Sequence, residues 1–149
     1  MKKIAWVLSG FDELTAAILY DIINLRCRVF VVEQNIPYID PDYKDQKALH
    51  LCGYIDNKLV AYCRLFKSGD YLDDACIGRV VVDKDHRMHG YGHDLMRKAI
   101  ELIGELFDED VITISAQLYL KSFYEGHGFV QVSEQYLEDT IPHIRMTRK

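Results

Sequence analysis

Residues 77–106 change their hydrophobic period in the middle, and this change constrains the fold more than any other feature of the sequence. Residues 77–82 are mostly β-branched, which is typical of a buried strand. Beyond Tyr91 the apolar residues recur three and four positions apart, as on one face of a helix. Between them lie Gly90 and Gly92, which permit a tight turn and a close approach of a ligand to the backbone. The stretch therefore predicts a strand, a glycine turn and a helix in succession.

The start of this predicted helix has the properties of an anion site. The first backbone N–H groups of a helix lack partners within it, and the helix dipole is positive at that end. A strand, a glycine turn and a helix start are therefore suited to binding phosphate. The chain contains neither Gly-x-x-x-x-Gly-Lys-Ser/Thr nor Gly-x-Gly-x-x-Gly after a strand. The pattern that it does contain is Arg87-x-x-Gly90-x-Gly92.

Length, charge and cysteine usage limit the class of protein. The 149 residues predict a single domain over residues 1–149. A net charge of −5 without a basic patch argues against a nucleic-acid partner. Polar residues within 9–13 interrupt the first apolar run, which predicts neither a signal peptide nor a membrane span. The cysteines form no Cys-x-x-Cys pair, so we expect reduced, mostly buried thiols in a cytoplasmic protein; they are Cys27, Cys52, Cys63 and Cys76.

The remaining patterns predict the order β-α-β-β-β-α-β-α-β-β, a mixed α/β (α+β) domain with helices packed on a sheet. A first helix is expected to begin at Ser9 or Asp12, and residues 35–46 are expected to form a loop where a lid over a pocket would lie. Residues 134–140 predict a second loop. Strands are expected over 3–8, 49–55, 59–66, 76–82, 111–117, 129–132 and 141–147.

The glycine pattern Arg87-x-x-Gly90-x-Gly92 resembles the Arg/Gln-x-x-Gly-x-Gly/Ala signature of the GNAT N-acetyltransferase superfamily, whose members bind the pyrophosphate of acetyl-coenzyme A on such a turn. Residues 123–129 are similar to the superfamily's Tyr-x-x-x-Gly-Phe segment. Residues 26–34 and 136–146 resemble two segments of ElaA-like members, with Thr140 in place of a glycine. The resemblance covers nearly the whole chain and implies a mostly antiparallel sheet with splayed central strands and flanking helices.

The resemblance also implies a function and a set of cofactor contacts. It implies an acetyl-coenzyme A-dependent N-acetyltransferase that transfers acetyl directly, in a ternary complex, to a small-molecule or peptide amine. The pyrophosphate contacts, mostly through backbone N–H groups, would come from Arg87, Met88, His89, Gly90, Tyr91 and Gly92. Main-chain groups of Val80, Val81 and Val82 would pair with the pantetheine arm and donate to the thioester oxygen. Gln117 stands where many members have an asparagine.

Catalytic and acceptor-binding residues follow from the same resemblance. Tyr124 matches the family's general acid, because a phenol is protonated at neutral pH and can give its proton to a thiolate. Its alternative role is that of a packed aromatic ring. The glutamate base of histone-type members falls on Cys76, so that role is not carried over. Glu33, His50 and His143 remain as candidate bases, with Glu33 favoured. Candidate acceptor contacts are Arg26, His50, Arg79 and His143.

Several alternatives stay open at this point. Arg26 and Glu33 are equally well explained as an ion pair with one another near a helix end. The histidines His86, His89 and His93 lack an accompanying carboxylate set, so we expect no metal. A coenzyme A-binding module without turnover would share the same cradle. Arg26-x-x-Val29-Phe30 also occurs in acyl-homoserine-lactone synthases, which share the GNAT-like fold. The amine is not identified, and a homodimer is one assembly left open.

Overall fold

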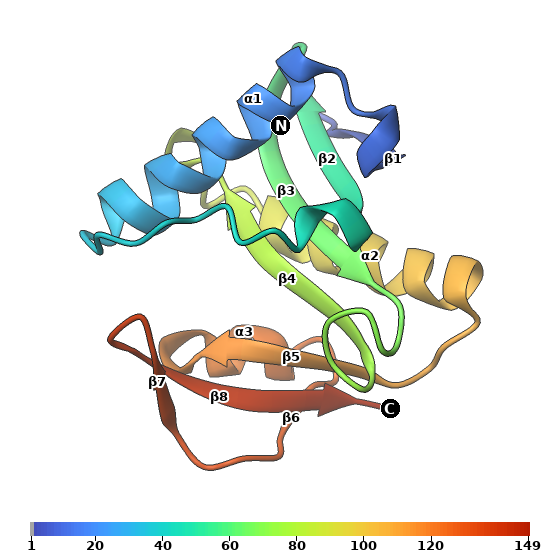
Figure 1. Cartoon of the computed structure of the whole chain (residues 1–149), viewed down its shortest axis with the longest axis vertical. Helices are drawn as coiled ribbons and strands as arrows, with labels where there is room; N and C mark the ends of the chain where they lie inside the picture. Colours follow the sequence, from blue (N-terminus) through green and yellow to red (C-terminus); the bar gives the residue numbers. More distant parts are fainter. Residues whose placement is uncertain (1) are drawn as a thin grey trace.

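Strand β4 (Ala75–Val82), the glycine turn and helix α2 (Tyr91–Phe107) follow one another in the computed structural model, which describes residues 2–149 (Figure 1). The succession predicted from the hydrophobic period is therefore confirmed. Gly90 is the N-cap residue of α2 and has φ 80° and ψ 6°. This left-handed conformation is one that glycine adopts without a steric cost.

The sheet of the described chain has eight strands in the order β1-β2-β3-β4-β5-β8-β6, with β7 also paired to β8. Only the β4–β5 pair is parallel, so the expected mostly antiparallel sheet is confirmed. The other strands are β1 (Ala5–Gly10), β2 (Leu49–Ile55), β3 (Lys58–Phe66), β5 (Ile112–Gln117), β6 (Val130–Gln131), β7 (Tyr136–Glu138) and β8 (Ile141–Arg148).

The central strands β4 and β5 separate soon after they meet. Their ladder joins only Ala75 to Ile112 and Cys76 to Thr113. Beyond this point β4 stays with β3 and β5 with β8, so the two strands diverge (Figure 1). Arg79, with φ 50°, lies in a bulge where the β3–β4 register shifts. One edge of β4 therefore presents backbone groups that no neighbouring strand pairs.

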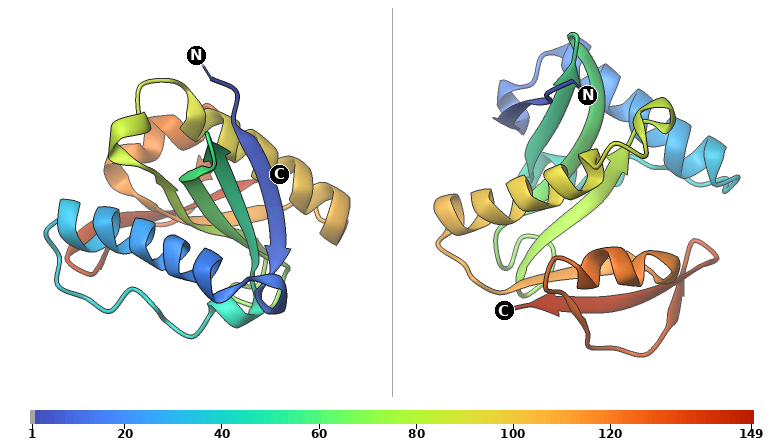
Figure 2. Two further views of the ribbon diagram at one scale, coloured as in Figure 1. Left: turned by 90° about the horizontal axis from the view of Figure 1, so that it is seen from above. Right: turned by 180° about the vertical axis from the view of Figure 1, so that it is seen from behind.

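Helices cover both faces of the sheet. Helix α1 (Ala16–Arg26) lies on one face, and α2 and the short α3 (Lys121–Glu125) lie on the other (Figure 2). Alternate strand residues face alternate sides, so each face has its own core. The α2 side buries Leu95, Met96, Ile114, Ile144 and Met146, among others. The α1 side buries Ile22, Leu25, Tyr62 and Val81. Among residues 2–149 no helix combines the length and apolarity that a membrane crossing requires.

The first helix begins later than predicted. It begins at Ala16, because the Thr15 hydroxyl accepts a hydrogen bond from the Ile18 N–H at 3.1 Å and caps it. Asp12 instead belongs to a short 3-10 turn, and Ser9 ends up in β1. At the other end the helix continues as a π-helix from Cys27 to Glu33. π-Helical segments occur often at functional sites, and the sequence pattern did not predict this one.

The second predicted loop is also partly wrong. Strand β7 occupies part of residues 134–140 and pairs with β8 across a tight turn. Asp139 and Thr140 in that turn both have positive φ, 49° and 68°. Two left-handed residues in succession are what a two-residue hairpin needs, and neither is the glycine that usually signals such a turn.

Candidate active site

A cavity of about 690 Å³ opens where β4 and β5 diverge. Its walls come from β4, from the turn and first residues of α2, from the π-helix, from α3 and from the ends of β5 and β8. Most of the residues predicted for the site line it: Glu33, Arg79, Val80, Val81, Val82, Arg87, Met88, Gly90, Tyr91, Gly92, Gln117, Tyr124 and His143. Arg26, His50 and His89 are outside its lining. The fold thus brings together segments that are up to about 110 positions apart in a single hollow.

The turn before α2 forms an open, backbone-lined end of this cavity. Met88 and Gly90 both adopt left-handed φ angles, 70° and 80°, so the chain bends sharply on either side of His89. A Cβ placed on Gly90 would meet no protein atom within 4 Å. A pyrophosphate group requires hydrogen-bond donors and room to bind. Unpaired N–H groups at the helix start and a neighbouring arginine are such donors, and the space beside Gly90 is open.

Arg87, the first residue of the pattern, is already engaged. Its Nη1 and Nη2 atoms donate to the two carboxylate oxygens of Glu33 at 2.6 and 2.9 Å, and its Nε donates to the Val82 carbonyl at 3.2 Å. The hydrogen bond from Arg87 lowers the pKa of Glu33. A carboxylate held in its ionised form in this way is a weak proton acceptor. The alternative of an Arg26–Glu33 ion pair is wrong, because Arg26 has other partners.

The three valines of β4 direct their side chains into both cores and leave their main chain at the cavity. Val80 and Val82 pack against the α2-side cluster, and Val81 belongs to the α1-side cluster. Gln117, at the end of β5, accepts a hydrogen bond from the Gln34 amide at 3.2 Å. The exposed β4 edge and this pair of amides offer neutral polar groups to a bound chain.

Tyr124 combines a packed ring with a hydroxyl that has no protein partner. The side chain is 6% exposed, and its ring meets Phe123 and Phe129 edge-on. No described residue forms a hydrogen bond with its hydroxyl, although the residue lines the cavity. Burial raises the pKa of Tyr124, so the phenol is protonated at neutral pH. A protonated phenol in the cavity wall is able to donate a proton.

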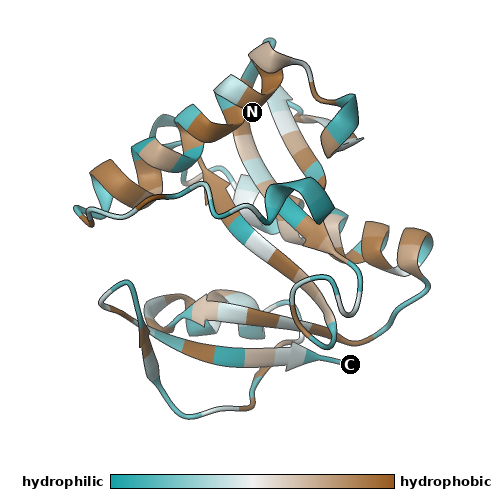
Figure 3. Cartoon of the chain, viewed as in Figure 1, coloured by the Kyte–Doolittle hydropathy of each residue, from teal (hydrophilic) through white to brown (hydrophobic). Residues whose placement is uncertain are grey.

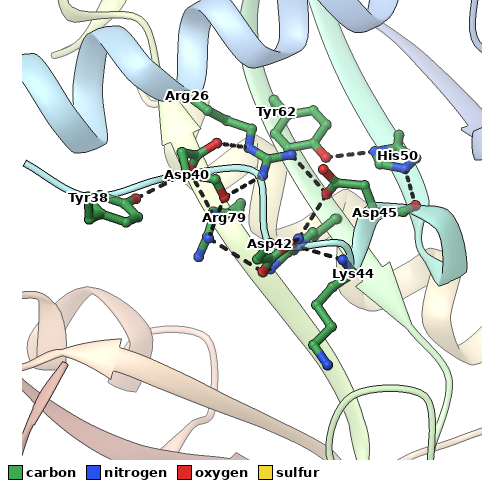
Figure 4. A network of polar contacts seen from close by, with 10 residues as sticks. Arg26, Tyr38, Asp40, Asp42, Lys44, Asp45, His50, Tyr62 and Arg79 are labelled. Carbon is green, nitrogen blue, oxygen red and sulfur yellow. Dashed lines mark hydrogen bonds and ion pairs between the residues drawn. The ribbon is translucent and has the colours of Figure 1, made fainter. Parts of the chain in front are cut away.

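A buried ionic network fixes residues 35–46 against the sheet (Figure 4). Arg26 donates to Asp40 at 2.8 Å and to Asp45 at 2.9 Å. Arg64 donates to Asp45 at 2.8 Å and to Asp42 at 2.6 Å. Figure 3 shows the turn Asp45–Lys47 as hydrophilic, yet Asp45 is buried because its carboxylate joins both guanidinium groups. With Arg79, which pairs with Asp40, three carboxylates meet three arginines, and the charges cancel.

This network overturns two of the predicted acceptor contacts. Arg26 and His50 are both fully buried, and neither lines the cavity. The His50 ring is held at Nδ1 by the Tyr62 hydroxyl at 2.7 Å and at Nε2 by the Asp45 carbonyl at 2.9 Å. Burial lowers the pKa of His50, and its proton-accepting position is occupied. Both residues were predicted as acceptor contacts, but residues 40–45 fold over them and enclose them.

Arg79 belongs to the network and to the cavity at once. Its Nε lies 3.0 Å from Asp40, and its Nη2 donates to the Asp40 carbonyl at 3.0 Å. The Tyr38 hydroxyl, which also bonds Asp40, lies in the cavity wall. Arg79 therefore holds the loop against the β4 bulge, and its charge is offset before any acceptor arrives.

His143 has a neighbour that the sequence reasoning did not single out. Its Nδ1 lies 2.8 Å from the Ile141 carbonyl, and its Nε2 lies 3.2 Å from a carboxylate oxygen of Glu138. Both residues line the cavity. Glu138 lies within residues 136–146, which resemble ElaA-like members, so this resemblance was the sequence feature that could have identified it.

The cysteines lie away from this chemistry. None of the four lines the cavity, and Cys52, Cys63 and Cys76 are buried. Burial raises the pKa of Cys52 and of Cys76 to about 12, which keeps both as thiols. Within residues 2–149 no group of three or more His, Cys, Asp or Glu side chains is arranged to hold a metal ion.

Comparisons with known proteins point in the same direction as the geometry. Residues 30–149 match the family model described as an acetyltransferase (GNAT) domain. The chain is 41% identical over 148 residues to Protein ElaA of Escherichia coli strain K12, covering 98% of this chain and 97% of the other.

Solved structures show the same similarity. An acyl-CoA N-acyltransferase from Pseudomonas aeruginosa superposes with a TM-score of 0.93 at 39% identity, covering 99% of this chain and 100% of that one. Escherichia coli ElaA superposes with a TM-score of 0.91 at 40% identity, with the same coverage. The AHL synthase LasI superposes with a TM-score of 0.79 at 10% identity, which is a likeness of fold alone.

Proposed function

This chain belongs to the GNAT acetyltransferase family, and on this premise we propose that it transfers the acetyl group of acetyl-coenzyme A to an amine. One observation supports the proposal most directly. A single cavity contains an anion-binding helix start, an unpaired strand edge and the hydroxyl-bearing Tyr124. These three parts match the pyrophosphate, the pantetheine arm and the leaving thiol of one extended substrate.

The binding roles follow the order of these parts along the cavity. The backbone of residues 87–92 would hold the pyrophosphate, because the first N–H groups of α2 lack partners within the helix and the space beside Gly90 is open. The main chain of residues 80–82 would pair with the pantetheine amides and place an N–H donor at the thioester oxygen. Gln117 is the last residue of β5, and its side-chain amide would offer a further polar contact to the bound chain.

The proposed reaction is a direct transfer. The amine nitrogen attacks the thioester carbonyl carbon, a C–N bond forms, and the C–S bond breaks. The thiolate takes the proton of Tyr124, and the phenol regains a proton lost by the nitrogen, so the charges balance. No cysteine lines the cavity, which supports transfer without an acetyl-enzyme.

The test is turnover with acetyl-coenzyme A and a panel of alkyl amines, amino acids and peptide N-termini, followed through free thiol and acetylated product. We expect thiol release that requires an amine, and no acetyl-cysteine in the intact protein. Calorimetric binding without amine-dependent release would instead support a non-catalytic coenzyme A-binding module. A product formed only from an acyl-carrier-protein donor would support the synthase alternative, and an acetylated cysteine on the pathway would exclude direct transfer.

A further inference from the structure

Tyr124 and His143 reach the same cavity from opposite faces of the sheet. Tyr124 belongs to the core on the α2 side, together with Ile144 and Met146 of β8. Because side chains alternate along a strand, His143 points to the other face. It lies opposite Gln117 in the β5–β8 register, and the Gln117 amide meets Gln34 from the segment that follows α1.

This placement separates two proton-transfer positions. A leaving thiolate on the α2 side would meet the Tyr124 hydroxyl. An amine approaching from the side of α1 and residues 35–46 would reach the part of the cavity wall that includes His143. The reaction needs a base that takes a proton from the amine and an acid that gives a proton to the leaving thiolate. The two groups must occupy different positions around the thioester carbonyl.

The hydrogen bonds of His143 fix which ring nitrogen can accept a proton. The Ile141 carbonyl can only accept, so the Nδ1 atom at 2.8 Å must donate its N–H. In the neutral ring the lone pair is therefore on Nε2. The ring is 6% exposed and stacks on Tyr136 at a centroid distance of 6.1 Å, which fixes its direction.

We propose that Nε2 of His143 accepts a proton from the acceptor ammonium, and that Glu138 is the positioning residue that stabilises the resulting imidazolium. This rests on the acetyltransferase function proposed above. The ammonium loses two protons overall. One passes to Nε2 and from there to solvent, while the half-exposed Glu138 carboxylate 3.2 Å away stabilises the imidazolium. The other leaves the attacking nitrogen and replaces the proton that Tyr124 gives to the thiolate.

The other titratable groups at this end of the cavity are less suited to the role. Glu33 is committed to Arg87, which lowers its pKa. Arg79 is paired with Asp40 and carries no lone pair. Burial raises the pKa of Tyr38, whose hydroxyl bonds Asp40, so it stays protonated. The remaining titratable neighbours are Asp139, which follows Glu138 in the turn, and Tyr136, whose ring stacks on the imidazole of His143.

The kinetic test compares His143→Gln with the wild-type protein on whichever amine of the panel is acetylated, at pH values below and above the pKa of that amine. A general base typically contributes ~10²- to 10⁴-fold, so we expect at least a ~10²-fold loss of kcat/KM at the lower pH. The deficit should shrink towards zero where the amine is already neutral. His127→Gln is the matched control, because that ring is outside the cavity lining. A deficit that is the same at every pH would show a merely structural role.

Glu138→Gln provides a second variant, because that side chain is half-exposed and its loss should not prevent folding. We expect a smaller loss than in His143→Gln, also confined to low pH, whereas Glu134→Gln in the preceding loop should behave as wild type. Calorimetric affinity for acetyl-coenzyme A should be unchanged in both cavity variants, since both side chains come from the β7–β8 hairpin and not from residues 87–92.

A measurement without turnover completes the test. Long-range ¹H–¹⁵N spectra of the free protein should show the neutral His143 ring protonated at Nδ1 and bare at Nε2. The opposite tautomer would overturn the proposal, and so would full activity of His143→Gln at low pH. Absence of amine-dependent thiol release from the wild-type protein would instead count against the acetyltransferase function, so the two failures are distinguishable.

Discussion

The carboxylate of Glu33 and the guanidinium of Arg87 form a bidentate ion pair, with O–N distances of 2.6 and 2.9 Å. The pair joins the last residue of the π-helix to the first residue of the phosphate turn, 54 positions away. It places a negative charge beside the site proposed for a pyrophosphate and neutralises the nearest cation. Glu33 therefore lies at the proposed coenzyme end of the cavity, although the sequence indicated a base for the acceptor.

Replacing Glu33 by Gln should strengthen acetyl-coenzyme A binding. The change removes a repelling carboxylate and frees Arg87 for the phosphates. Partly exposed ion pairs are worth roughly 0.2–1 kcal/mol, so we expect a gain of a few-fold that decreases as salt is added. Calorimetry at two ionic strengths measures it, with Glu105→Gln at the exposed far end of α2 as the control.

The same variant also tests the base assignment. Arg87 holds the pKa of Glu33 below its usual range, so Glu33 stays ionised throughout neutral pH. The acidic limb of the kcat/KM profile should consequently keep its position in Glu33→Gln. A limb displaced in this variant, with His143→Gln unchanged, would return the base role to Glu33.

The charge at the helix start can be tested with a pair of substitutions at Gly90. Asp and Asn have the same size, tolerate left-handed φ and cap helices well, so both variants should fold. Only Asp adds a charge beside the phosphates. Like-charge repulsion near a surface is worth roughly 1–4 kcal/mol, so Gly90→Asp should bind acetyl-coenzyme A at least ~5-fold more weakly than Gly90→Asn. Equal affinities would mean that the phosphates bind elsewhere.

Tyr124→Phe should separate catalysis from binding and from stability. The phenyl ring keeps its contacts with Phe123 and Phe129, and the lost hydroxyl leaves no protein partner unpaired among the described residues. We expect a fall in kcat of at least ~10-fold with an unchanged unfolding midpoint and unchanged coenzyme affinity. A wild-type kcat, with the chemical step shown to limit turnover, would leave Tyr124 as a packing residue only.

The ionic network should make the protein sensitive to acid. Burial opposes ionisation of Asp42, but the hydrogen bond and charge of Arg64 lower its pKa from 3.8 to about 2. A folded-state pKa below the unfolded one adds stability above the unfolded value, and this stability is lost as the pH falls towards 2. Linkage sets this contribution at about 2 kcal/mol.

Urea unfolding between pH 7 and pH 2 measures this loss without adding salt. Asp42→Asn should be less stable than wild type at neutral pH and should show a shallower decline on acidification. Asp110→Asn, at an exposed position, serves as the control. Parallel pH profiles for wild type and Asp42→Asn would show that the Asp42–Arg64 contact contributes nothing to acid sensitivity.

Much of the part of the cavity proposed for the cofactor could be predicted because its residues are contiguous. Residues 87–92 run from the end of a 3-10 turn into the start of α2, so the motif that identifies them also fixes their relative positions. Tyr124 was identified in the same way, from a segment with its own glycine and phenylalanine. The acceptor end could not be predicted to the same degree, since its walls come from the π-helix, residues 35–46 and the β7–β8 hairpin.

The sequence by itself determined the strand, the left-handed glycine turn and the helix that follows it, because hydrophobic period and permitted φ angles are local properties. Only the tertiary structure decided the partners of Arg26, Glu33 and His143. An ion pair or a hydrogen bond depends on which loop folds against which strand, and local sequence patterns do not specify this arrangement. The buried Asp45 shows the reason most clearly: its sequence neighbours are exposed polar residues, and its burial is stabilised by two arginines, each 19 positions away.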